Sequence, residues 1–305
     1  MLSRVAERIY WLARYIERAE NTARLVNTYH FLLLDMPRGT KVGWHILPYI
    51  AGSSELFNEC YQRQDERNTV KYLLADSINP ASIVNSITMA RENARTSRDE
   101  LPGYAWEQIN ELYIYTRDNV STALARRGRF SFLTETILRC QQLTGLLAGT
   151  MSHDLRYDFI RIGRNIERAD MTTRVIDIGA MSLKEEDEAR AHDVHVWTSM
   201  LHALNAYQMY RKDVQLGVHC EDVVGYLLQN NYFPRSVTHC IDQIEESIAI
   251  LPKYKDPLAQ LRATRRRVDK IKPATLTAES LHKEVDQIQI GISALHGQIC
   301  STWFE

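Results

Sequence analysis

The feature that most constrains the fold of this chain is a short sequence that occurs twice. Residues 16–26 read IERAENTARLV and residues 166–176 read IERADMTTRVI, at an offset of 150 residues. Ile, Glu, Arg and Ala recur in order, followed in both copies by an acidic residue, a threonine and an arginine. Repetition at this distance predicts two related structural units within one chain.

The composition is that of a helical protein without a dominant charge. The 305 residues include only 13 glycines and 8 prolines, which favours long uninterrupted helices. The net charge of −1 argues against nucleic acid or a membrane surface as the partner. Five isolated cysteines form no CxxC pair, and neither a secretion signal nor an apolar run of about 18 residues is present. We therefore expect a cytoplasmic protein with reduced thiols.

Apolar spacing, caps and helix breakers predict the elements. A first helix should run from about Ser3 to Asp35 and end at Pro37 and Gly39. Residues 126–129 (RRGR) read as a loop and residues 184–188 (KEEDE) as a solvated connection. A helix is expected near 80–100, and Pro102 fits the first turn of the next one. Ser152 and Asp154 can cap the helix that carries the second repeat, up to about Ala180. Other helices are expected near 130–149, 190–212, 219–230, 235–250, 257–271 and 277–303.

No segment alternates persuasively as a strand would. The prediction is an all-α fold, a multi-helix bundle in which the two repeat helices are related by an internal pseudo-repeat. We expect one domain over residues 1–305, with interlocked halves of about 1–150 and 151–305.

Each repeat helix carries a charged face opposite an apolar stripe. On the first, the charged face holds Arg14, Glu17, Asn21 and Arg24 at spacings of 3, 4 and 3, with Arg18 one step around the helix. On the second it holds Arg164, Glu167, Met171 and Arg174, with Arg168 beside them and Asp170 four residues before Arg174. A surface helix has no reason to repeat these charges, so the faces are expected to meet protein groups in a polar layer.

Arginines beside carboxylates recur elsewhere, as in Glu92 with Arg95, and further arginines stand at Arg211 and Arg235. Together they could hold a carboxylate or phosphate ligand through paired hydrogen bonds. Three interpretations stay open: a network that only sets helix register, a ligand or catalytic site, and an exposed partner-binding face.

Other motifs are weaker. Glu279-x-x-His282 is half of a di-iron motif and has no second copy, and His192-x-x-His195 alone is a poor metal signal, so we expect neither a metal nor a cofactor. No phosphate-binding glycine loop and no GxSxG elbow occur. The basic run of residues 262–272 is most simply a solvated helix face; docking onto an acidic partner or RNA is the alternative.

Four segments resemble the bacterial alpha-E family, an all-helical domain named for its ER motifs. They are MLSRVAERIYWLARYIERAENTAR, ARENARTSRDELPGYAWEQINELY, FIRIGRNIERADMTTRVID and NNYFPRSV, in the family's order and over nearly the whole chain. The motif positions are Glu17, Arg18, Glu92, Arg95, Glu167, Arg168, Asp170, Arg174 and Arg235. Pro102–Gly103 and Asn230–Asn231 depart from the family's usual pattern, outside the ER cores.

The resemblance suggests which proteins work together with this chain, but it does not suggest a reaction mechanism. Relatives are typically encoded beside an ATP-grasp-type ligase and a transglutaminase-like protein, which suggests a system that makes or trims peptide-like amide bonds. We therefore expect an accessory component that binds the ligase, or an anionic peptide-like substrate, through the Arg/Glu layer. The alternative is an enzyme in which Glu17 or Glu167 is the general acid or base. A homodimer is plausible.

Overall fold

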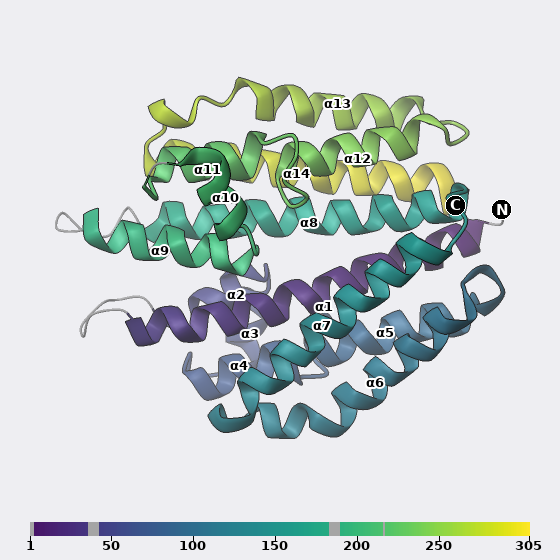
Figure 1. Cartoon of the computed structure of the whole chain (residues 1–305), viewed down its shortest axis with the longest axis horizontal. Coiled ribbons are helices and arrows are strands. Elements are labelled where there is room, and N and C mark those ends of the chain that lie inside the picture. Colours follow the sequence, from purple (N-terminus) through teal and green to yellow (C-terminus); the bar gives the residue numbers. More distant parts are fainter. Residues whose placement is uncertain (1–2, 36–42, 183–189, 216) are drawn as a thin grey trace. The chain divides into compact units, whose positions relative to one another are not determined.

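In the computed structural model, residues 3–35, 43–182, 190–215 and 217–305 are described. Within these residues the fold is all-α, as predicted, and no strand occurs (Figure 1). The helices are α1 Ser3–Asp35, α2 Ile46–Ile50, α3 Ser54–Cys60, α4 Glu66–Leu74, α5 Ile83–Arg95, α6 Gly103–Ala123, α7 Arg126–Thr150, α8 Leu155–Ser182, α9 Arg190–Ala203, α10 Tyr207–Val214, α11 Cys220–Gln229, α12 Val237–Ala249, α13 Lys255–Lys270 and α14 Ala278–Trp303, with short 3-10 turns η1 Arg98–Glu100 and η2 Pro273–Thr275.

The chain forms two compact units. Unit 1 comprises Met1–Asn27 and Gly43–Arg164, and unit 2 comprises Thr28–Val42 and Asn165–Glu305. Both divisions fall inside the helices that carry the repeat, so α1 and α8 each contribute residues to both units. The single domain and the pseudo-repeat stay predictions.

The predicted loop at residues 126–129 is wrong, because these residues open α7. Arg129 is buried, and its guanidinium donates to the carbonyls of Ala123 and Leu124 at the end of α6. Gly128 lies so close to Thr122 that an added Cβ would be 2.6 Å from the Thr122 carbonyl oxygen. Contacts of Arg129 and Gly128 with the end of α6 thus replace the expected loop with an abrupt junction between two helices.

The helix expected over residues 80–100 is shorter. It begins at Ile83, where the Ser82 hydroxyl caps the backbone N–H of Asn85 at 3.3 Å, and it ends at Arg95, before η1. Pro102 occupies the N-cap of α6 rather than its first turn. Local capping determines where these helices begin and end, and the spacing of apolar residues alone does not predict those positions.

The helix expected over residues 190–212 is two helices, α9 and α10, separated at Asn205. Asn205 has φ of 53°, a left-handed conformation that ends a helix and that asparagine tolerates. Pro37, Gly39 and residues 184–188, for which a helix end and a solvated connection were expected, lie outside the described residues.

In unit 2, α13 and α14 run side by side (Figure 1). Gly291 of α14 makes the close approach possible, since a Cβ there would be 2.6 Å from the Thr264 hydroxyl oxygen of α13. The end of α13 is secured by Gln229 of α11, whose amide donates to the carbonyls of Val268 at 2.9 Å and Ile271 at 2.8 Å. The start of the segment between α13 and α14 is therefore anchored to α11.

Candidate functional site

The repeat segment of α1 is buried on both of its faces. The apolar stripe is buried as expected, with Ile16 5% exposed and Ala19 fully buried. The charged face is buried as well, since Glu17 is 1% exposed and Asn21 is 2% exposed. Buried carboxylates require polar partners, so this face meets protein groups rather than solvent.

Gln141 and Cys140 of α7 approach the carboxylates of α1 within unit 1. The Gln141 amide donates to Glu20 at 3.5 Å, and Arg24 donates to the same carboxylate at 2.9 Å. Burial raises the pKa of the Cys140 thiol well above its ordinary value, and the nearby negative charges of Glu20 and Glu17 raise it further. Cys140 is therefore a neutral, unreactive thiol at the edge of the carboxylate cluster.

The arginines of this segment lie against aromatic rings of their own helix. The Arg14 guanidinium is 4.9 Å from the Trp11 ring centroid and donates to the Tyr10 hydroxyl at 3.3 Å. The Arg18 guanidinium is 5.6 Å from the Tyr15 ring centroid. Cation–π contacts hold these half-buried side chains in defined positions while they keep their charge.

A small cavity adjoins Glu17 inside unit 1. Its volume is about 20 Å³, and Arg164 and Thr144 are the polar residues that line it with Glu17. Its remaining walls are apolar, formed by Leu12, Ala13, Ile16, Leu147 and Ile160. Such a volume holds about one water molecule and has no room for an amino acid.

The second repeat helix, α8, shows a similar mixture of burial and pairing in unit 2. Glu167 is 4% exposed, and Arg174 Nε lies 2.7 Å from the Asp170 carboxylate. Burial opposes the charge of Arg174, but the carboxylates of Asp170, Glu167 and Asp177 outweigh it, and the pKa of Arg174 is raised. Arg168 is half-buried on the same helix.

Arg235 is drawn towards α8 within the same unit. It is 7% exposed, and its carbonyl oxygen accepts a hydrogen bond from the buried Thr172 hydroxyl at 2.7 Å. This bond ties the segment before α12 to the repeat segment of α8. The threonine that recurs in both copies of the repeat is thus a structural contact in the second copy.

Three of the expected site residues lie at the surface. Glu92 and Arg95 pair at 2.9 Å with side chains 41% and 54% exposed, and Arg211 is exposed beside the Tyr207 hydroxyl. Exposed pairs of this kind contribute about 0.5 kcal/mol. These three residues are not among the buried polar residues.

Polar residues that the motifs did not indicate also lie in the interior. They are Asp158, Asn165 and Asp177, together with Cys140 beside Glu20, whereas Gln141 reaches Glu20 from an exposed position on α7. Asp177 accepts from the His282 ring at 2.5 Å, which connects α8 to α14. Among the described residues, no group of three or more His, Cys, Asp or Glu side chains is arranged to hold a metal ion.

A family model described as a predicted alpha-helical domain with a conserved ER motif matches residues 1–304. The chain belongs to the alpha-E family. Glu17-Arg18 on α1 and Glu167-Arg168 on α8 are Glu-Arg pairs of the kind that the family description names. No helix among the described residues has the length and apolar character needed to cross a bilayer.

Three curated mycobacterial proteins are similar to this alpha-E chain. Each is an uncharacterized protein, one from Mycobacterium bovis and two from strains of Mycobacterium tuberculosis, and each is 23% identical over 95% of this chain. The chain spans only 35% of the length of these relatives. No solved structure matches the chain.

Proposed function

We propose that this alpha-E chain is a binding component of a bacterial ATP-grasp peptide-ligase system. It holds the ligase, or an anionic peptide-like substrate, through arginines of the Arg/Glu layer, and it does not itself carry out the chemistry. Its proposed partners are an ATP-grasp-type ligase and a transglutaminase-like protein, and its proposed location is the cytoplasm.

The surroundings of Glu17 are the observation that supports a binding role. The carboxylate is 1% exposed, and the cavity beside it has a volume of about 20 Å³. A general acid or base has to come within hydrogen-bond reach of the group that it protonates or deprotonates, and this cavity beside Glu17 admits about one water molecule. By contrast, the side chains of Arg14 and Arg18 are half-buried rather than fully buried.

Direct binding tests this proposal. The purified chain, mixed with the ATP-grasp-type ligase of the same genome, should elute as a stoichiometric complex whose mass is measured by light scattering. Replacing both Arg14 and Arg18 by Gln should weaken the complex by about tenfold or more, because charged pairs at an interface each contribute about 1 kcal/mol or more.

A matched control removes the same charge elsewhere. Arg117 and Arg126 lie on the surface of unit 1, each paired with an acidic neighbour, and replacing both by Gln should leave the complex unchanged. Circular dichroism establishes that both double variants fold. Equal weakening by the two variants, or the absence of a complex with the ligase, would contradict the proposal.

A further inference from the structure

The basic run of residues 262–272 divides into paired and unpaired cations. Arg262 bonds Glu245 at 2.9 Å, and Arg265 bonds Asp269 at 2.9 Å and also Asp242. Arg267 bonds Glu284 of α14 at 3.3 Å. These arginines brace α13 against its neighbours, as a solvated helix face with ion pairs would.

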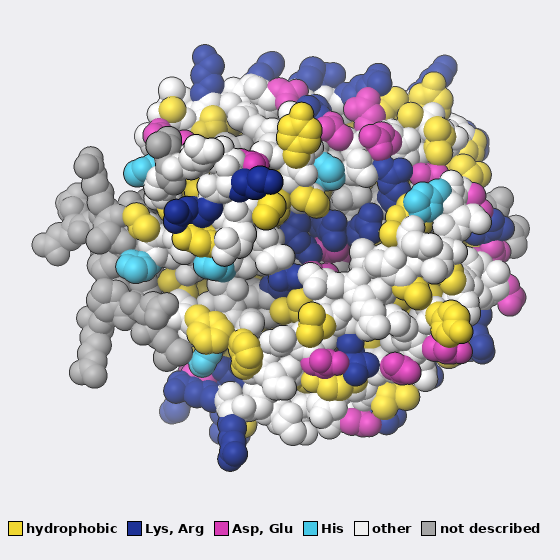
Figure 2. Space-filling model, in the orientation of Figure 1, with side chains coloured by type: hydrophobic (Ala, Val, Ile, Leu, Met, Phe, Trp, Pro, Cys, Tyr) yellow, Lys and Arg dark blue, Asp and Glu magenta, His cyan; other side chains and the backbone are white. Residues whose placement is uncertain are grey.

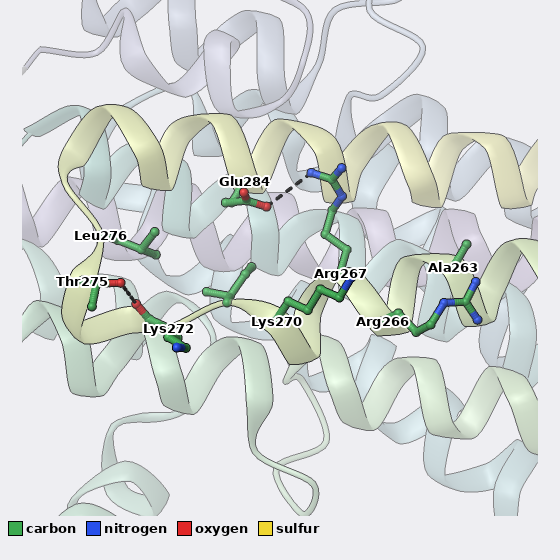
Figure 3. Close-up of a pocket in the computed structure, with 9 residues that line it drawn as sticks. Ala263, Arg266, Arg267, Lys270, Lys272, Thr275, Leu276 and Glu284 are labelled. Carbon is green, nitrogen blue, oxygen red and sulfur yellow. Dashed lines mark hydrogen bonds and ion pairs between the residues drawn. The ribbon is translucent and has the colours of Figure 1, made fainter.

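The other three cations of the run lie together in an open groove. Arg266, Lys270 and Lys272 line a depression with a volume of about 500 Å³ between the end of α13 and the start of α14 (Figure 3). Their charged groups form no hydrogen bond or ion pair with the described part of the chain; the bond drawn at Lys272 is made by its backbone carbonyl. A row of lysine and arginine side chains also marks the edge of the space-filling view over α13 (Figure 2).

The groove has a firm base. Ile271, at its floor, is 7% exposed, and its carbonyl accepts from the Gln229 amide at 2.8 Å. Pro273 packs over Gly225 of α11, where an added Cβ would lie 3.5 Å from the proline ring. The cations therefore project from a backbone that is already in position, which lowers the entropic cost of binding.

The charge and lining of the groove define its ligand. Four cationic side chains and the Glu284 carboxylate line it, so its net charge is +3. Ala263, Ile271 and Leu276 supply apolar surface, and none of the described lining residues is aromatic. A single-stranded nucleic acid would need rings on which its bases stack, whereas an acidic peptide needs cations and some apolar contact.

The spacing of the cations fits an extended chain. Arg266 and Lys270 are one helical turn apart, which places their Cβ atoms about 5–6 Å from each other. Alternate side chains of an extended peptide point the same way at intervals of about 6.6 Å. Carboxylates on every second residue would thus meet successive cations along the groove.

We propose that this groove binds an extended acidic peptide segment with carboxylates on alternate residues. The site lies outside the ER segments and within unit 2, so it is independent of the ligase-binding role proposed above. Binding of such a peptide would give a role to the three cations of residues 262–272 that form no ion pair within the described part of the chain.

The test uses the full chain and a fluorescent ten-residue peptide of alternating Glu and Ala, followed by fluorescence anisotropy at low salt. The wild-type chain should bind this peptide and not the corresponding Gln–Ala peptide. Replacing Arg266, Lys270 and Lys272 by Gln should weaken binding by about tenfold, since each removes one exposed charge pair. Raising the salt concentration should weaken wild-type binding as well.

Arg262→Gln is the matched control, because it removes a cation of the same run that is bonded to Glu245 outside the groove. Its affinity for the peptide should stay within about twofold of wild type. Weakening by Arg262→Gln equal to that by a single groove substitution such as Lys270→Gln would overturn the proposal, because binding would then follow net charge alone. Tighter binding of tripolyphosphate or of a single-stranded RNA than of the acidic peptide would overturn it too.

Discussion

Replacing Gly163 by Ala is expected to destabilise unit 1 by about 2–3 kcal/mol. Gly163 lies on α8 against α1, and an added Cβ would be 2.4 Å from the Tyr10 carbonyl oxygen and 3.2 Å from its carbonyl carbon. The obstacle is backbone rather than a side chain that could rotate away, so the helices must separate. Alanine favours an isolated helix by about 1 kcal/mol over glycine, and this gain is smaller than the cost of the clash.

Gly145→Ala is the matched control for this prediction. Gly145 is an exposed residue of α7, and an added Cβ there would meet nothing within 4 Å. The same substitution should therefore stabilise the chain by about 0.5–1 kcal/mol. Urea unfolding followed by circular dichroism compares the two variants. A gain in stability for Gly163→Ala would show that α1 and α8 do not approach this closely.

Arg129→Ala should lower the free energy of unfolding of unit 1 by about 3 kcal/mol. The Arg129 side chain is 3% exposed and lies 2.8 Å from the Glu66 carboxylate, while it also donates to two carbonyls of the α6–α7 junction. Its removal leaves these acceptors without a donor in a site that water reaches poorly. Arg126 contacts the same carboxylate from a solvent-exposed position, so Arg126→Ala should change stability much less.

The pH dependence of the two variants provides a second readout. Hydrogen bonds from Arg126 and Arg129 hold the pKa of Glu66 below its ordinary value, although burial acts in the opposite direction. A carboxylate with a lowered folded-state pKa stabilises the fold at neutral pH, and this contribution is lost as the pH falls through that pKa. The stability difference between wild type and Arg129→Ala should therefore shrink on acidification below about pH 4. A difference that stays constant over this range would mean that Glu66 is not the partner that matters.

Structural features that depend on residues close together in the sequence were predicted well. The span of α1, the burial of its apolar stripe and the cap of α8 by Asp154 follow from periodicity and from capping chemistry within a few residues. The Arg24–Glu20 and Arg174–Asp170 pairs are also local, at i,i+4 spacing, and both are present.

The errors arose where distant residues determine the structure. RRGR reads as a loop from its composition, yet Arg129 bonds Glu66, which lies 63 residues away. The surface position of Glu92 and Arg95 could not be distinguished from that of Glu17 by motif alone, because both sets have helical spacing. The groove at the end of α13 depends on Gln229 and on α14, which no property of the basic run itself reveals.

The arginines of the ER segments are proposed to bind a partner, and the carboxylates of these segments are proposed not to catalyse. The most direct measurement is product formation by the ATP-grasp-type ligase in the presence of wild-type chain, Glu17→Gln or Glu167→Gln, with each fold checked by circular dichroism. The folded variants should support at least half of the wild-type rate, because an isosteric amide preserves the shape of the side chain that it replaces. A folded variant with a rate about 100-fold lower, as expected for the loss of a general acid or base, would contradict it.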